Sequence, residues 1–195
     1  MVIKRYSSKS IFNGFRILTF DSEAYRYYEQ LKGIENQKLS IGIIYSGNDY
    51  YIYHNIREFK EFIQAELDKT DKLMLIAHNM RYDLQLLGLI DYFVNNDEFM
   101  FMKKNIKKQM IGSVNFFEFT QGKKKLVFLD SFNFFKHSLK EIAKELGYKK
   151  YADEEYKLPP EEWNIYIEKN GLELCKLDCK IYFTNWHILI TPSIK

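Results

Sequence analysis

Four carboxylates lie at three separated places where the sequence predicts the end of a strand or part of a helix. Asp21 and Glu23 directly follow a predicted strand, and Asp83 lies near the start of a predicted helix. Residues two apart on an extended segment point the same way, so Asp21 and Glu23 are expected to face one side. Asp178 lies in a predicted helix among apolar neighbours, where an acid is costly unless it is paired or binds a metal.

Taken one at a time, these acids have ordinary structural explanations. An Asp after a strand is common in turns and caps, so Asp21 and Glu23 alone would be interpreted as a solvated pair. Together, the four carboxylates offer the hard oxygen ligands that Mg²⁺ and Mn²⁺ prefer. Two such ions held close together can activate water and stabilise both the attacking and leaving oxygens of a phosphodiester. The acids therefore predict a site for two Mg²⁺ or Mn²⁺ ions, provided that folding brings them together.

The elements that must position these acids alternate between strands and helices. Helix periodicity begins at Ile56, and the apolar run 73–77 indicates a strand buried on both faces. Ser138 and Glu141 form a capping box at the start of a further helix. This pattern predicts an α/β domain whose mixed β-sheet is flanked by helices. Strands are expected at 15–20, 39–45, 50–53, 73–77, 110–119 and 126–129, and helices from 56, at 82–94, from 138 to 147, from 159 and at 172–190.

Length and composition fit a single globular domain over residues 1–195. Hydrophobic residues make up 46% and charged residues 28% of the chain, which excludes disorder as its main state. A net charge of +3 is too small to argue for nucleic-acid binding by itself. We expect residues 1–13 to form a short basic arm, and Cys175 and Cys179 to be reduced and structural. With no apolar run long enough to span a membrane, an intracellular, non-secreted protein is expected.

An ordered set of motifs over residues 15–190 resembles a known family. It consists of Asp21-Ser22-Glu23, the segment 78–83 (HNMRYD), the segment 129–135 (LDSFNFF) and the segment 175–179 (CKLDC). The set is similar to the 3′–5′ exonuclease domain of family B DNA polymerases of the protein-primed and organellar or plasmid type. That resemblance implies a ribonuclease H-like fold.

The same resemblance implies roles for individual acids. Asp21, Glu23 and Asp178 would hold the catalytic metal, Asp21 would bridge to a second ion, and Asp83 would complete the site.

It also implies ligands for the nucleic acid. Asn79 and Tyr82 would contact the single-stranded primer end, and Ser131 with Phe132 would be further single-strand ligands. A lysine before the last helix would assist the reaction, and either Lys149 or Lys150 is in about the right place.

One position departs from the family pattern. The family usually has a water-orienting Tyr four residues before the last acid, or a His five before it, but here Leu174 and Glu173 occupy these positions. Leucine cannot hydrogen-bond to water. One helical turn separates Leu174 from Asp178, so the leucine side chain is expected to point towards the metal site.

The function implied is metal-dependent 3′–5′ exonuclease activity on single-stranded DNA 3′ ends. The chain would be the proofreading domain of a family B polymerase, or a stand-alone relative, with a polymerase domain or terminal protein as partner. The alternatives are a catalytically weakened nucleic-acid-binding module of the same fold and a 3′–5′ exoribonuclease. A lysine-rich hairpin region at 103–128 is either a solvated rim or a single-strand channel, and the aromatic residues near it are Phe99, Phe101, Phe116, Phe117 and Phe119.

Overall fold

An eight-stranded mixed sheet forms the centre of the described structure, with strand order β3-β2-β1-β4-β8-β7-β6-β5. The computed structural model describes residues 14–29, 34–105, 116–135, 137–148 and 155–190. Strands β1, β4 and β8 run parallel, and the remaining neighbours pair antiparallel. The strands are β1 (Arg16–Glu29), β2 (Ile34–Tyr45), β3 (Tyr50–Tyr53), β4 (Lys72–Ala77), β5 (Glu98–Phe99), β6 (Met102–Lys104), β7 (Phe116–Gln121) and β8 (Lys124–Asp130).

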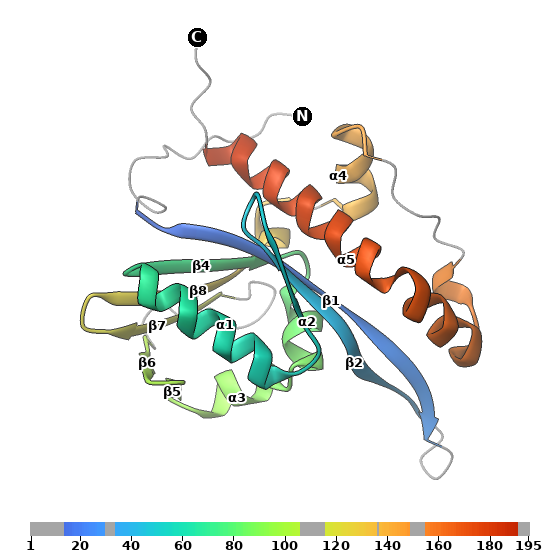
Figure 1. Ribbon diagram of the computed structural model, residues 1–195, viewed down its shortest axis with the longest axis horizontal. Coiled ribbons are helices and arrows are strands. Elements are labelled where there is room, and N and C mark those ends of the chain that lie inside the picture. The colour runs from blue at the N-terminus through green and yellow to red at the C-terminus, as the bar shows by residue number, and fades with distance from the viewer. Residues whose placement is uncertain (1–13, 30–33, 106–115, 136, 149–154, 191–195) are drawn as a thin grey trace.

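Helices cover both faces of this sheet (Figure 1). One face packs against α1, α2 and α3, and the other packs against α4 and α5. This arrangement confirms the predicted α/β fold with a mixed sheet, and it is consistent with a ribonuclease H-like fold. None of the described helices is long and apolar enough to cross a membrane. The helices are α1 (Ile56–Lys69), α2 (Met80–Leu86), α3 (Leu89–Asn95), α4 (Leu139–Glu145) and α5 (Pro160–Ile190).

At two glycines the predicted helix boundaries are wrong, in opposite ways. The helix expected at 82–94 is broken into α2 and α3 by Gly88, which adopts a left-handed conformation with φ 67°. The two helices expected from 159 and at 172–190 are a single helix, α5. Gly171, in the middle of α5, is buried where a Cβ would lie 3.2 Å from Ile41 on β2. This glycine therefore lets α5 approach the sheet closely and does not end a helix.

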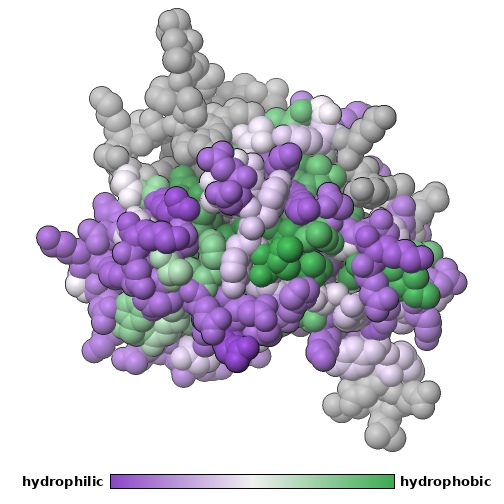
Figure 2. Space-filling view, in the orientation of Figure 1, coloured by the Kyte–Doolittle hydropathy of each residue, from purple (hydrophilic) through white to green (hydrophobic). Residues whose placement is uncertain are grey.

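The aromatic side chains near the lysine-rich region belong mainly to the core. Phe99 and Phe119 are fully buried and Phe117 is nearly so, whereas Phe116 is half-buried and Phe101 is exposed. The three buried rings belong to the core. They pack around Phe93 with ring centroids 4.9–5.0 Å away. The rings packed around Phe93 are therefore not available to stack on bases. On the face of the molecule shown in Figure 2, the apolar areas are separated by hydrophilic side chains.

Three lysines of the same region have structural roles. Lys104 donates hydrogen bonds to the carbonyls of Phe93 and Val94 near the end of α3. Lys124 bonds the Leu67 carbonyl near the end of α1, and Lys125 pairs with a buried glutamate, Glu118. A single-strand channel built from these particular side chains is not supported. Residues 106–115 lie outside the described part of the chain, and so does the arm at 1–13.

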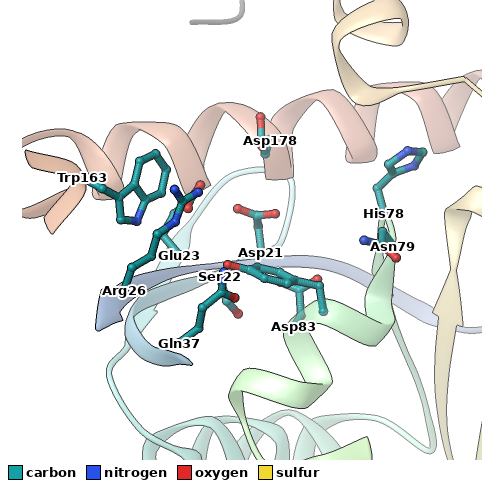
Figure 3. A pocket seen from close by; sticks show the side chains of 11 residues that line it. Asp21, Ser22, Glu23, Arg26, Gln37, His78, Asn79, Asp83, Trp163 and Asp178 are labelled. Atoms are coloured by element: carbon teal, nitrogen blue, oxygen red, sulfur yellow. The ribbon is translucent and has the colours of Figure 1, made fainter. Parts of the chain in front are cut away.

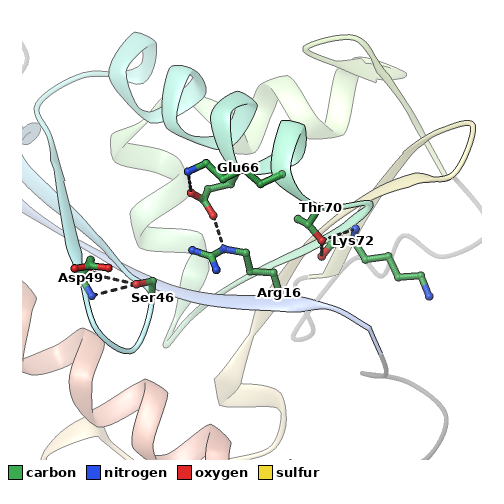
Figure 4. A network of polar contacts seen from close by, with 7 residues as sticks. Arg16, Ser46, Asp49, Glu66, Thr70 and Lys72 are labelled. Atoms are coloured by element: carbon green, nitrogen blue, oxygen red, sulfur yellow. Dashed lines mark hydrogen bonds and ion pairs between the residues drawn. The ribbon is translucent and has the colours of Figure 1, made fainter.

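Polar ties fix β1 against α1 (Figure 4). Glu66, on α1, is buried and forms ion pairs with Arg16 at the start of β1 and with Lys69. Directly after α1, the Thr70 hydroxyl accepts a hydrogen bond from the backbone N–H of Lys72, which is the first residue of β4. These contacts fix the adjacent strands β1 and β4 at their amino ends.

Replacing Gly42 by alanine should destabilise the fold strongly. A Cβ at Gly42 would lie 2.1 Å from the ring of Tyr53, which is fully buried and bonded through its hydroxyl to Ser22. Because the ring cannot move away without losing that bond, Gly42→Ala should lower the free energy of unfolding by about 3 kcal/mol. Urea denaturation followed by circular dichroism measures this. Lys38→Ala, an exposed change on the same strand, should stay within about 0.5 kcal/mol of wild type; equal effects of the two changes would contradict the explanation.

Candidate metal centre

The candidate site lies where the three parallel strands end. Thr19 on β1 pairs with Ile76 on β4, and Ile76 pairs with Leu129 on β8. The residues two positions beyond this row are Asp21, His78 and Ser131. The sheet therefore brings three of the four sequence motifs to one edge, which is where open α/β sheets place their ligand sites.

Helix α5 adds the fourth motif from the other side of the pocket. Thr19 donates a side-chain hydrogen bond of 2.9 Å to the carbonyl of Cys179, which fixes α5 against β1. Cys175 and Cys179 are free and buried, and burial raises the pKa of both thiols well above its usual value. They pack as small apolar residues, as expected, and Asp178 lies between them in sequence, on the helix that borders β1.

Asp21, Glu23 and Asp178 form a buried carboxylate cluster. Each offers an oxygen that lies within 4.8 Å of the oxygens offered by the other two. All three side chains are 5–7% exposed, although each belongs to a residue type that is rarely buried. The two acids from β1 and the acid from α5 are thus brought together, as their spacing and the family resemblance predicted.

Asp83 lines the same pocket but stands outside this group of three. It is 2% exposed and comes from α2, across from α5. Burial raises its pKa well above the usual carboxyl value, and Glu23 raises it further, while a hydrogen bond from Ser22 opposes the shift. One of its oxygens, Oδ1, is buried and accepts no hydrogen bond from any described residue.

The donor set fits divalent cations. Four carboxylates around a pocket of about 240 Å³ supply only hard oxygen ligands, which suit Mg²⁺ and Mn²⁺. Buried like charges raise each other's pKa, and cations bound among them would remove that penalty. The buried Oδ1 of Asp83 is a polar atom whose desolvation a metal or its bound water would offset.

Asp130 is a positioning residue that the sequence analysis did not assign. Its carboxylate accepts hydrogen bonds from the backbone N–H groups of Asn79, Met80 and Phe132. Asn79 is held with φ 59°, an unusual conformation for a non-glycine residue, and its side chain makes no capping bond to α2. The amide of Asn79 therefore remains part of the pocket wall. The signal available in the sequence was an acid directly after the predicted strand 126–129. The structure aligns this acid with Ala77 of β4.

The predicted nucleic-acid ligands occupy two positions. Asn79 and Tyr82 line the pocket beside the acids. Ser131 and Phe132 do not line it, but each contacts His78, which does: the Ser131 hydroxyl lies 3.0 Å from Nδ1 of His78, and Phe132 meets that ring edge-on. In Figure 3, His78 and Asn79 stand on one side of the acids, and Trp163 and Arg26 stand on the other. The binding roles of these residues stay predictions.

Leu174 does not point into the pocket, so that expectation was wrong. It is buried against Trp163 and Ile167, in a hydrophobic cluster that also contacts Tyr25. Four residues advance a helix by slightly more than one turn, and here the offset directs Leu174 to the β1–β2 hairpin. Lys149 and Lys150 lie outside the described residues.

A phenol nevertheless reaches the acids from one turn after Asp178. The buried hydroxyl of Tyr182 donates a 3.1 Å hydrogen bond to Oδ1 of Asp21. Its ring stacks on His78 with centroids 5.9 Å apart. Burial and the charge of Asp21 raise the pKa of Tyr182 well above 10, so it stays a donor at neutral pH. Sequence reasoning missed it because it searched only the positions before Asp178.

Removing the charge of Asp83 should stabilise the metal-free protein. Asp83→Asn keeps the shape of the side chain and removes a buried carboxylate beside Glu23, which should raise the free energy of unfolding at pH 7 by about 1 kcal/mol. The pKa of Asp83 is higher in the folded than in the unfolded chain, so the wild type gains stability as the pH falls towards about 4. The advantage of the variant should shrink over the same range.

Thermal melts in EDTA at pH 5 and 7 test this, and Asp91→Asn, an exposed acid on α3, is the control. A lower melting temperature for Asp83→Asn than for wild type at pH 7 would contradict the interpretation. With saturating Mn²⁺ the order should reverse, because the wild type gains metal-binding energy that the variant lacks.

Tyr182→Phe should weaken metal binding without unfolding the chain. The ring stays packed on His78, but Asp21 loses the bond that orients it. Loss of such an orienting bond typically costs 10–100-fold in metal affinity. Calorimetric titration with Mn²⁺ measures the change. The control is Tyr148→Phe, which removes a hydroxyl that contacts Thr184 on α5, the helix that carries Tyr182, and should leave the Mn²⁺ affinity unchanged. A Mn²⁺ affinity of Tyr182→Phe equal to that of the wild type would refute this role of Tyr182.

The fold is shared with part of a known polymerase. The complex of Phi29 DNA polymerase with primer-template DNA and incoming nucleotides matches with a TM-score of 0.51 and 17% identity, over 85% of this chain and 29% of that chain. The orthorhombic crystal form of Phi29 DNA polymerase matches with a TM-score of 0.49, 19% identity and the same coverage. No protein-family model and no curated protein matches. This chain spans less than a third of those polymerase chains and has the fold of the part it matches.

Proposed function

We propose that this protein is a metal-dependent 3′–5′ exonuclease that acts on single-stranded DNA. The observation that carries the proposal is the buried cluster of Asp21, Glu23 and Asp178, whose ligand oxygens lie within 4.8 Å of one another. Acids gathered in this way, at the edge where parallel strands end, suit a phosphodiesterase that works with two divalent cations. The fold likeness to a DNA polymerase supports the choice of DNA as substrate.

Asp21, Glu23 and Asp178 would hold the ions, and Asp83 would complete the site from α2. Bound ions supply an activated water and stabilise charge on the attacking and leaving oxygens of the phosphodiester. The protein's part is to fix these carboxylates. Tyr182 orients Asp21 through its side chain, and Tyr53 bonds both the Ser22 hydroxyl and the Asp21 carbonyl.

Two pocket residues have the chemistry to bind the terminal nucleotide. Burial and three nearby carboxylates raise the pKa of Tyr82, so its phenol remains a hydrogen-bond donor at neutral pH. Asn79 presents an amide that α2 does not use as a cap. Both groups come from the start of α2, which Asp130 holds in place. We propose that they position the 3′ end against the acids.

The decisive test is shortening of a labelled strand. A 5′-labelled single-stranded DNA should be degraded from its 3′ end with Mg²⁺ or Mn²⁺ present and should stay intact in EDTA. Asp21→Asn and Asp178→Asn should each reduce the rate at least about 100-fold, because each removes a ligand of the ions. Asp91 is exposed and is not among the residues that line the pocket, so Asp91→Asn should keep the wild-type rate.

Each outcome assigns a function. Full activity in both pocket variants would refute the proposal. Tight DNA binding without cleavage would identify a binding module that has lost catalysis, and faster digestion of matched RNA would identify an exoribonuclease. Blunt duplex DNA should be digested more slowly than the single strand. A proofreading role beside a polymerase domain, with a terminal protein as a further partner, is part of the same proposal. Preferential removal of a mismatched 3′ nucleotide would support the proofreading role.

A further inference from the structure

We infer that Arg26 binds a backbone phosphate of the strand whose 3′ end lies at the carboxylates. The inference rests on the proposed function and extends it, because it adds a phosphate subsite at the end of the pocket away from His78. Its basis is the way the outer half of β1 is built and latched to α5.

Beyond Thr19, no strand in the described part of the chain pairs with one edge of β1. Strand β4 pairs only with residues 16–19 of β1, whereas β2 follows β1 on the other edge to residue 29. The resulting two-stranded hairpin extends past the rest of the sheet (Figure 1). A backbone edge of this kind must find other partners.

The first turns of α5 supply these partners. The indole Nε1 of Trp163 donates a 2.8 Å bond to the carbonyl of Ala24. The side-chain amide of Asn164 accepts from the backbone N–H of Arg26 and donates to its carbonyl, both at 2.8 Å. Asn164 thus imitates a neighbouring strand at one residue and fixes the backbone of Arg26 in place.

The side chain of Arg26 is fixed as well. Its guanidinium carbon lies 4.3 Å from the ring centre of Trp163, which is 2% exposed. The in-plane N–H donors of a guanidinium match two oxygens of a phosphate, whereas a contact with an aromatic ring uses the charge of the group. The contact with Trp163 therefore helps to hold the Arg26 side chain at the pocket.

Charge explains why such a residue is needed here. Among the described residues that line the pocket, four are carboxylates and Arg26 is the single lysine or arginine. Bound ions would balance the carboxylates, but every further nucleotide adds a negative phosphate. Figure 3 places the Arg26 guanidinium beside Glu23. Gln37 pairs with Arg26 across the hairpin, is exposed and lines the same pocket, so it adds a side-chain amide to the pocket wall.

The test measures DNA binding and not cleavage. The affinity of a fluorescent single-stranded oligonucleotide is measured at several salt concentrations, with Ca²⁺ replacing Mg²⁺ as a cation that takes oxygen ligands; gel analysis verifies that the strand stays intact. Arg26→Gln should weaken binding about tenfold and reduce the slope of log K against log salt by about 0.7, the value for one phosphate contact on a single strand. Arg26→Lys should keep the slope but bind more weakly, because it loses the in-plane N–H donors of the guanidinium.

One matched control and one further variant complete the design. Arg57→Gln removes a positive charge from an exposed position on α1, outside the residues that line the pocket, and should leave both affinity and slope unchanged. Melting temperatures identify any variant that is merely unfolded. Trp163→Phe keeps a ring under the guanidinium but loses the bond to Ala24, and should weaken binding while retaining the wild-type slope.

A wild-type slope and affinity in Arg26→Gln would overturn the inference and leave the proposed function intact. So would unchanged DNA binding together with tighter Ca²⁺ binding, because Arg26 would then serve only as a counter-ion to Glu23. A wild-type protein that neither binds nor shortens the strand would instead refute the proposed function itself, and the subsite with it.

Discussion

The contact between α5 and the first strand is the interaction on which the site depends. Without it, Asp178 would be an isolated acid on a long helix, more than 150 residues from Asp21 along the chain. The Thr19–Cys179 hydrogen bond and the absence of a side chain at Gly171 let the helix lie close along β1 and β2. Close approach brings Asp178 to Asp21, brings the Tyr182 hydroxyl to the same carboxylate, and latches the hairpin through Trp163 and Asn164. One packed interface therefore builds both the carboxylate cluster and the wall beside it.

Packing α5 against β1 buries carboxylates, and the rest of the fold must offset the free-energy cost of that burial. Burying four carboxylates in one pocket opposes folding when no cation is present, as the raised pKa of Asp83 indicates. The opposing contribution comes from the core beneath, where Phe20, Phe59 and Phe128 pack with ring centroids 5.7–6.4 Å apart. Such an arrangement keeps the ligands in place before the ions arrive, so little reorganisation is needed on binding. Stability given up at a site is a common sign of function.

Local patterns were informative where one residue decides a local structure. The capping box of Ser138 and Glu141 is present with both of its hydrogen bonds. Gly88 is an exception, because a continuous helix was predicted through it and its left-handed conformation separates α2 from α3. The same kind of reasoning failed where the reason for a residue lies in another element. The reason for Gly171 is a strand that packs against it, and the reason for Lys104 and Lys124 is the helix end that each of them contacts. Aromatic and basic residues that are neighbours in sequence are divided here between the core and its edges, so their density did not predict a binding surface.

By itself the sequence determined the fold class and the identity of the acids, because strand ends, helix starts and the order of motifs are local signals. It predicted that Asp21 and Glu23 share a face, and the structure has both in one cluster. Tertiary structure alone decided which further groups meet them. Tyr182 brings a phenol to Asp21 from one turn after Asp178, Leu174 packs against the hairpin, and Arg26 contacts a tryptophan 137 positions later in the chain. These contacts depend on the register and distance between packed elements, and no periodicity within one element encodes either quantity.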